Sequence, residues 1–223
     1  MDRKTEATDG QIVVDLVTDP SEIARVESQN ALQQFDFAMN FVDVVVAQGV
    51  KFELGRDLVY ELNRLATVGV KANAGKPRQI PVGIGGSQHV PPPWEDVTRH
   101  VDEMCQYVNS NWGASPIHLA AYLLWRINWV HPFEDGNGRT ARMLSYTILC
   151  IRLGFVLPGI RTIPEQIASN KMPYYTALEA ADAAHAKGTI SLRVLETLLS
   201  DMLANQLTDV FDQAVGASGS TGP

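Results

Sequence analysis

The sequence HPFEDGNGRTAR, residues 131–142, separates the two most apolar parts of the chain. Residues 117–130 and 143–155 contain few polar side chains, which is typical of helices at the centre of a fold. Pro132 disfavours helical backbone at His131, so the first of these helices is expected to end there. The stretch is therefore predicted to be a loop in the middle of a mainly helical domain.

The second half of this loop has the residue types of an anion site. Gly136, Asn137 and Gly138 tolerate positive φ, so they allow a tight turn with inward-pointing backbone N–H groups. The second helix is expected to begin near Gly138, and a helix N-terminus attracts anions. Arg139 and Arg142 share one face of its first turn, where two cations oppose the helix dipole. Polyphosphate would offset that arrangement, because amides and guanidinium groups both bind its oxygens.

The remaining side chains of the loop indicate the chemistry. A carboxylate close to phosphates suggests Mg²⁺, which prefers one or two carboxylates plus phosphate oxygens. His131 has the pKa range needed to deprotonate an incoming hydroxyl. A lone histidine, a Gly-Asn-Gly turn or an arginine pair would each be an ordinary structural feature. Their combination in one loop favours nucleotidyl or phosphoryl transfer to a hydroxyl group.

One competing motif overlaps this loop. GNGRTA, residues 136–141, matches the dinucleotide-binding fingerprint G-x-G-x-x-A. That fingerprint follows a strand within a βαβ unit. The segment before it is too long and too rich in Leu and Ala for a strand, and the chain shows no alternating βαβ pattern. We therefore reject a dinucleotide site.

Bulk properties narrow the class of protein. The 223 residues are 45% hydrophobic, which suits one globular domain. The net charge of −7, with no cluster of lysines or arginines, argues against nucleic acid as a partner. The polar N-terminus does not resemble a signal peptide, and no apolar run approaches the roughly 18 residues of a membrane helix. With only Cys105 and Cys150, a disulfide framework is not expected, so we predict a cytoplasmic protein without membrane contacts.

The chain is predicted to be an all-α single domain over residues 19–214. Residues 1–18 form a loose lead-in with a short extended piece at 11–17, and residues 215–223 a disordered tail. Asp19 and Pro20 predict the start of a long helix that ends near Gly49. Further helices are expected over 56–68, 95–111, 115–130, 138–153, 170–186 and 191–213.

Residues 76–92 differ from the rest, because they lie in a stretch rich in Gly and Pro. Ile80, Val82 and Ile84 alternate ahead of Gly85 and Gly86, which predicts a short β-hairpin or flap. Pro81 cannot donate a hydrogen bond to a sheet, so the strand must be an edge or only partly paired.

The loop residues 131–142 resemble the signature of Fic-domain proteins, H-x-F-x-(D/E)-G-N-G-R-x-x-R, at every specified position. The flap and the two apolar helices also resemble that family, over roughly residues 20–200. The resemblance implies the all-α Fic fold, a helical bundle with a small β-hairpin flap near the active site. It implies AMPylation, which is the transfer of AMP from ATP to a Ser, Thr or Tyr hydroxyl of a target protein with release of pyrophosphate.

The resemblance also implies residue roles. His131 would be the general base, and Asp135 would bind the Mg²⁺ that bridges the α- and β-phosphates. The buried Phe133 would anchor the loop, while Glu134 falls at a variable position and is expected to be a solvated acid. The flap, through Ile80, Val82 and Ile84, would bind an extended target segment along its free edge. Cofactor binding would fall to Phe133, to the anion nest of Gly136, Asn137 and Gly138, to Arg139 near the β-phosphate and to Arg142 near the γ-phosphate.

Glu27 is the one candidate for self-inhibition. Many relatives carry (S/T)-x-x-x-E-(G/N) on a helix, and its glutamate pairs with the second motif arginine, here Arg142. Glu27 has Ile23 four residues before it and Ser28 after it, so both flanking positions depart from the pattern. An inhibitory glutamate and a solvated helix acid remain equally open.

Other functions remain open as well. One is Fic-type transfer of phosphate, phosphocholine or another nucleoside monophosphate, or the removal of AMP. Transfer of a terminal phosphoryl group is associated with an altered motif, so the intact GNGRTAR favours AMP. Another is a non-catalytic binding module, which the presence of both His131 and Asp135 disfavours. A homo-oligomer is possible.

Overall fold

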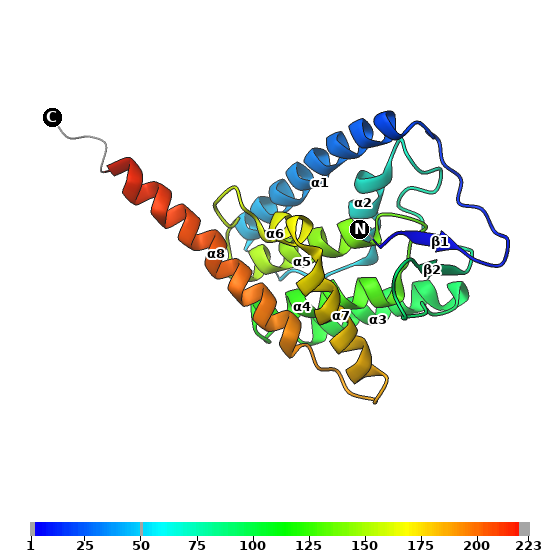
Figure 1. Ribbon diagram of the computed structural model, residues 1–223. Helices are drawn as coiled ribbons and strands as arrows, with labels where there is room; N and C mark the ends of the chain where they lie inside the picture. The colour runs from blue at the N-terminus through cyan, green and yellow to red at the C-terminus, as the bar shows by residue number, and fades with distance from the viewer. Residues whose placement is uncertain (1–2, 50, 219–223) are drawn as a thin grey trace.

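The computed structural model describes residues 3–49 and 51–218. Within those residues it is a bundle of eight α-helices with one small two-stranded sheet, as predicted from the sequence (Figure 1). The elements are β1 Thr5–Ala7, α1 Pro20–Gln48, α2 Arg56–Thr67, β2 Val82–Ile84, a 3₁₀ turn Trp94–Asp96, α3 Val97–Ser110, α4 Pro116–Val130, α5 Asn137–Leu153, α6 Ile163–Ser169, α7 Lys171–His185 and α8 Arg193–Ser218.

The helix α1 begins and ends where the sequence predicts. The side chain of Asp19 accepts a hydrogen bond from the backbone of Glu22, and Pro20 occupies the first turn. Gly49 closes the helix with a φ of 60°, a conformation that glycine adopts without strain. These caps fix the position of α1 along the chain.

The helices α4 and α5 form the centre of the bundle. Both are buried around most of their circumference, and α1, α2, α3, α7 and α8 pack around them. Leu123 and Ile127 of α4 and Leu144 and Ile148 of α5 are fully buried in one continuous core. The loop that joins the two helices is therefore held at the middle of the fold, as expected from its apolar flanks.

The helix α6 was not predicted. Thr162 caps it by accepting from the backbone of Glu165, while the Glu165 carboxylate accepts from the backbone of Thr162. This capping box was readable in the sequence TIPE, with Pro164 in the first turn. The helix has only 7 residues, which is too short for a clear apolar period.

The C-terminal region departs from the expectation of a disordered tail. α8 continues to Ser218, so residues 215–218 are helical, and it runs outward from the bundle (Figure 1). The rest of the predicted tail, residues 219–223, lies outside the described residues.

The predicted flap hairpin is wrong in its pairing. β2 forms no hairpin within residues 72–93; its partner is β1, from the segment predicted to be loose. The strands are antiparallel, with Thr5 opposite Ile84 and Ala7 opposite Val82. The predicted extended piece at 11–17 contributes one isolated bridge, from Asp15 to Lys71. Pro81 does mark the limit of the strand: it directly precedes β2, and its carbonyl accepts from Thr8.

Over the described residues, 3–49 and 51–218, no helix has the length and apolarity needed to cross a membrane. Cys105 and Cys150 are both buried free thiols.

Candidate active site

The loop between α4 and α5 is shaped by His131, Phe133 and Asn137. His131 caps α4 in the left-handed conformation, with a φ of 50°. The Asn137 side chain then spans the loop: its oxygen accepts from the Phe133 N–H at 2.9 Å, and its amide donates to the Phe133 carbonyl at 2.8 Å. The Phe133 ring is buried edge-on against Tyr60, with ring centroids 5.9 Å apart. Phe133 therefore anchors the loop in the core.

The turn into α5 depends on Gly136. It has a φ of 75° and precedes the helix, which begins at Asn137, one residue earlier than predicted. Asn137 and Gly138 are helical, so of the three turn residues only Gly136 needs positive φ. A side chain from α2 holds this turn, because the Asn63 amide donates to the Asp135 carbonyl at 2.9 Å and to Thr140 Oγ1 at 3.2 Å.

We expect Gly136→Ala to destabilise the protein and Gly138→Ala to leave its stability nearly unchanged. A Cβ at Gly136 would lie 2.6 Å from Thr67 Cγ2 and 2.9 Å from Asn63 Nδ2, in a backbone conformation that alanine disfavours. Such strain costs about 2 kcal/mol. The melting temperature should fall by roughly 4–8 °C, measured by thermal unfolding. At Gly138 the new Cβ would be 3.4 Å from the nearest atom, Arg142 Nη1, so an equal loss there would contradict this account.

His131 is a buried, neutral imidazole. Its side chain is almost inaccessible, and burial lowers its pKa to about 3, opposed by a smaller effect of the Asn128 backbone. Its Nε2 lies 2.8 Å from the Thr5 hydroxyl on β1. The imidazole therefore stays unprotonated near neutral pH with a hydroxyl at hydrogen-bonding distance, which is the arrangement that a general base needs.

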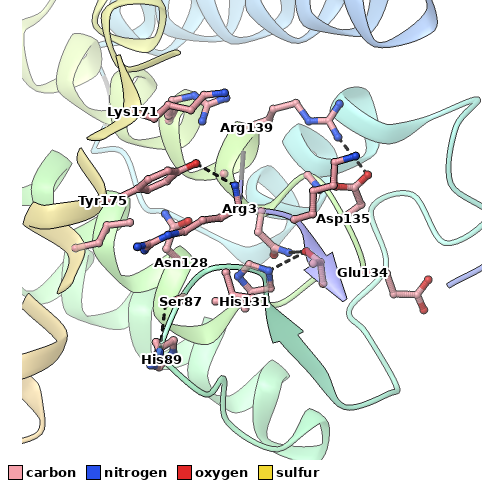
Figure 2. A pocket seen from close by; sticks show the side chains of 18 of the residues that line it. Arg3, Ser87, His89, Asn128, His131, Glu134, Asp135, Arg139, Lys171 and Tyr175 are labelled. Atoms are coloured by element: carbon pink, nitrogen blue, oxygen red, sulfur yellow. Dashed lines mark hydrogen bonds and ion pairs between the residues drawn. The ribbon is translucent and has the colours of Figure 1, made fainter. Parts of the chain in front are cut away.

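Asp135 and Arg139 lie together at the start of α5 (Figure 2). Arg139 Nη2 is 3.4 Å from Asp135 Oδ2, and Lys71 Nζ approaches the same oxygen at 3.7 Å. Arg139 Nη1 also donates to the Ala66 carbonyl at 3.0 Å. The Asp135 carboxylate is partly exposed, so it remains accessible to a ligand.

A cavity of about 460 Å³ brings these groups together. Such a volume suits a small-molecule ligand. His131, Asp135 and the start of α5 line it on one side, and α1, α7, β1 and β2 line it on the others. Six cationic side chains face it in a protein of net charge −7: Arg3, Lys4, Lys71, Arg139, Arg142 and Lys171. Five carboxylates also line it, those of Asp15, Glu27, Glu134, Asp135 and Asp182, so the cavity is of mixed charge with a small excess of cations.

Glu27 lies at this cavity and forms an ion pair with the first arginine of the motif. Glu27 Oε1 accepts from Arg139 Nη1 at 2.8 Å, whereas the resemblance named Arg142 as the partner. Arg139 and Arg142 are three residues apart on one helix, so a carboxylate entering from α1 can meet either. Glu27 thus contacts the motif and is not a solvated acid of a remote helix face.

The flap residues occupy three different environments. Ile84 lines the cavity, Val82 is buried and Ile80 is half-buried. The free edge expected beside the site is paired with β1 in this structure. The prediction of a free flap edge is therefore wrong for this conformation.

The sequence did not identify two residues that support the loop, and it misjudged a third. Arg78, which is only 2% exposed, donates to the His131 carbonyl at 2.8 Å and to the Ile80 and Pro92 carbonyls. Asn63 holds the turn from α2. Neither lies in a motif, so no local pattern pointed to them. Glu134, expected to be solvated, is buried and accepts from Asn73 at 3.0 Å, because its backbone is fixed inside the pinned loop.

Comparisons with known proteins identify one family. Residues 53–149 match the Fic/DOC family. The chain is 32% identical over 160 residues to the protein adenylyltransferase Fic of Drosophila persimilis, covering 70% of this chain and 29% of that protein. The same enzyme of Drosophila willistoni is also 32% identical, over 70% of this chain and 30% of its own length. The chain thus spans less than a third of these relatives.

Solved structures support the fold. A Fic domain-containing signalling protein from Bacteroides thetaiotaomicron superposes with a TM-score of 0.65 at 22% identity, covering 82% of this chain and 71% of the other. Fic-1 from C. elegans superposes with a TM-score of 0.62 at 23% identity, over 96% of this chain and 57% of the other. Sequence match, fold and loop geometry lead to one assignment: the chain is a Fic-domain protein of the Fic/DOC family.

Proposed function

We propose that this protein transfers AMP from ATP to a hydroxyl group of a target protein and releases pyrophosphate. The observation that carries the proposal is the neutral His131 imidazole, with a hydroxyl 2.8 Å from its Nε2, beside a cavity that holds two arginines at the start of a helix. A base, an acceptor and an anion site are thereby adjacent. The relatives named protein adenylyltransferase Fic support the same chemistry.

The nucleotide would bind at the start of α5. Gly136 directly precedes the helix, and Asn137 and Gly138 begin its first turn, where the backbone N–H groups of the helix start and the helix dipole attract phosphate. Arg139 and Arg142 both line the cavity and would bind phosphate oxygens through their guanidinium groups. ATP is therefore the proposed substrate of this site.

Mg²⁺ is the proposed cofactor, and the residues present fit it. Asp135 presents a partly exposed carboxylate at the cavity. Among the residues that the structure describes, no three or more His, Cys, Asp or Glu side chains cluster as a metal site. One carboxylate together with substrate phosphates is the ligand set that Mg²⁺ accepts. When bound, the ion would neutralise phosphate charge and favour departure of pyrophosphate.

Asp135→Ala is expected to weaken ATP binding in the presence of Mg²⁺ about fivefold, with partial recovery at high Mg²⁺. The loss is moderate because the arginines and the helix start remain. Calorimetry with and without Mg²⁺ measures it. Asp15→Ala is the matched control, since Asp15 also lines the cavity and pairs with Lys71. Affinity that ignores Mg²⁺ in both wild type and Asp135→Ala would contradict the metal assignment.

The target protein is proposed to bind along β2. An extended segment adds to a strand through backbone hydrogen bonds, so only its alternate side chains contact the protein. Ile84, the last residue of that strand, lines the cavity, and Val82 and Ile80 precede it at alternate positions. His131 would then take the proton of the hydroxyl that the strand places at Nε2.

ATP labelled at the α- or γ-phosphate tests the proposal against its alternatives. Transfer of the α-label to protein, with none of the γ-label, supports AMPylation. Transfer of the γ-label would instead indicate phosphoryl transfer, and transfer of neither would favour a non-catalytic binding module. Loss of label from a protein already carrying AMP would indicate the reverse reaction.

The cytoplasm is the proposed location. The site would use ATP, which is abundant inside cells. The free thiols of Cys105 and Cys150 fit a reducing compartment.

A further inference from the structure

The strand β1 occupies the edge at which a target segment would bind. Its residues pair with β2 in antiparallel register, and the Gly85 N–H donates to the Lys4 carbonyl at 2.8 Å. The Thr8 N–H donates to the Pro81 carbonyl at 3.2 Å at the other end of the pair. The chain therefore places its own N-terminal segment on β2 by the strand addition proposed for a target.

Thr5 is the residue of β1 that faces the site. Exposure alternates along the segment: Arg3, Thr5 and Ala7 are half-buried, whereas Lys4 and Glu6 are exposed. Thr5 lies directly opposite Ile84, and both residues line the cavity. The inward face of the strand thus carries one hydroxyl, that of Thr5.

Hydrogen bonds orient this hydroxyl. The Asn137 amide donates to Thr5 Oγ1 at 3.4 Å, and His131 Nε2 lies 2.8 Å from the same oxygen. When Nδ1 of His131 carries the imidazole proton, the hydroxyl donates its hydrogen to Nε2. A hydroxyl that accepts from Asn137 and donates to His131 is arranged for loss of its proton.

The segment is anchored on both sides of Thr5. The backbone N–H of Arg3 donates to the Tyr175 hydroxyl of α7 at 3.2 Å (Figure 2). The Arg3 guanidinium lies 4.3 Å from the centroid of the Tyr175 ring and pairs with Glu179. Farther along, the Leu16 N–H donates to the Val70 carbonyl at 2.8 Å. These contacts fix the strand over the site without filling it, because Arg3, Lys4 and Thr5 line a cavity of about 460 Å³.

We propose that Thr5 is the intramolecular acceptor of this enzyme, so that the protein AMPylates its own N-terminal strand; this rests on the proposed function. Thr5 Oγ1 bonds to the α-phosphorus of ATP while His131 Nε2 takes the hydroxyl proton. The bond from the α-phosphorus to the oxygen bridging the β-phosphate breaks, and pyrophosphate leaves with that electron pair. The product is a phosphodiester between Thr5 and AMP, and the imidazolium returns its proton to water.

The arrangement also makes β1 a competitor of any other target. Both would need the same edge of β2, so a target gains access only when β1 leaves. An intramolecular strand has a high effective concentration, which favours the self-bound state. Modification of Thr5 places a charged nucleotide between β1 and the loop, so it should favour release of the strand.

The test is to incubate the full chain with Mg²⁺ and α-labelled ATP, map the label by peptide mass spectrometry and measure pyrophosphate release in parallel. We expect the label on Thr5, at a first-order rate that does not change on dilution. Thr5→Val keeps the shape of the side chain and should lower self-labelling about tenfold or more. Thr5→Ser should restore it. Glu6→Pro, which disrupts the middle of β1, should lower labelling of Thr5, and pyrophosphate release should fall with it, because each pyrophosphate that leaves requires an acceptor for AMP.

Thr8→Val is the matched control, because Thr8 is exposed and, three positions along the extended segment, belongs to the face opposite that of Thr5. Unchanged self-labelling in a folded Thr5→Val protein, or label that maps elsewhere in the wild type, would overturn the inference. If pyrophosphate release and labelling of other proteins persist in that case, the proposed function stands. If neither α-label transfer nor pyrophosphate release occurs in any variant, the proposed function fails and the inference fails with it.

Discussion

Replacing His131 with alanine or asparagine is expected to lower AMP transfer by about 10²–10⁴-fold and to leave Mg·ATP affinity within a few-fold. The reason is that His131 is proposed to act on the acceptor hydroxyl, and a hydroxyl lies 2.8 Å from its Nε2, whereas the phosphates are proposed to bind at the start of α5. Asparagine is the more informative replacement, because it tolerates the left-handed conformation at this position and so preserves the loop. Transfer is measured with α-labelled ATP, and affinity by calorimetry.

His118→Gln serves as the control. His118 contacts Tyr107 and Glu196 away from the cavity, so its loss should leave transfer unchanged. The pH profile adds an independent check. A histidine with an ordinary pKa would lose its base form below about pH 6.5. Burial lowers the pKa of His131 to about 3, so transfer should not decline between pH 8 and pH 6 through protonation of this group. Near-normal transfer by a folded His131→Asn protein would contradict the role.

The loop was predictable from the sequence because its determinants are local. Pro132 ends α4 at His131 through a clash between adjacent residues, and Gly136 supplies the one positive φ that the turn into α5 requires. The anchoring of Phe133 follows from the apolar helices on either side. Such effects act over a few residues, so they can be read from the chain directly.

The strand β1 could not be predicted, because its determinants are not local. The segment from Lys4 to Thr8 is polar and short, with no apolar alternation to mark a strand. It becomes a strand only because β2 presents an edge much later in the chain, with Thr5 opposite Ile84. Arg78 is similar: its role depends on the carbonyls of His131, Ile80 and Pro92, which meet only in the folded protein. Both β1 and the role of Arg78 therefore depend on contacts between segments that are distant in the sequence.

The position of Glu27 could be predicted from local sequence, but its contact with Arg139 could not. A capped helix start made its position on α1 predictable, and the resemblance suggested an arginine partner. The choice of Arg139 depends on how α1 packs against α5, which the sequence does not specify. The contact between Glu27 and Arg139 matters for activity, because Arg139 also approaches Asp135 and is proposed to bind phosphate.

Glu27→Gly is expected to raise AMP transfer roughly five- to tenfold. Arg139 Nη1 donates to the Glu27 carboxylate at 2.8 Å, and ATP must displace that carboxylate to use the same guanidinium. Competition of this kind corresponds to a coupling of about 1–3 kcal/mol between two ligands of one group. The pair is partly exposed, with Glu27 at 38% and Arg139 at 23%, so solvent screening keeps the gain toward the lower end. The rate of α-label incorporation into protein measures it.

Matched variants test whether the gain in AMP transfer comes from loss of the Glu27–Arg139 ion pair or from a general change in α1. Glu27→Gln keeps the length of the side chain but removes its charge, so it should give most of the gain. Glu22→Gln removes an exposed acid of the same helix, whose partner is Arg25, and should give none. Adding Arg139→Ala to Glu27→Gly should abolish the gain, since the released guanidinium is then absent. An unchanged rate in a folded Glu27→Gly protein would show that the ion pair is structural, because ATP would then bind productively with Glu27 still in place.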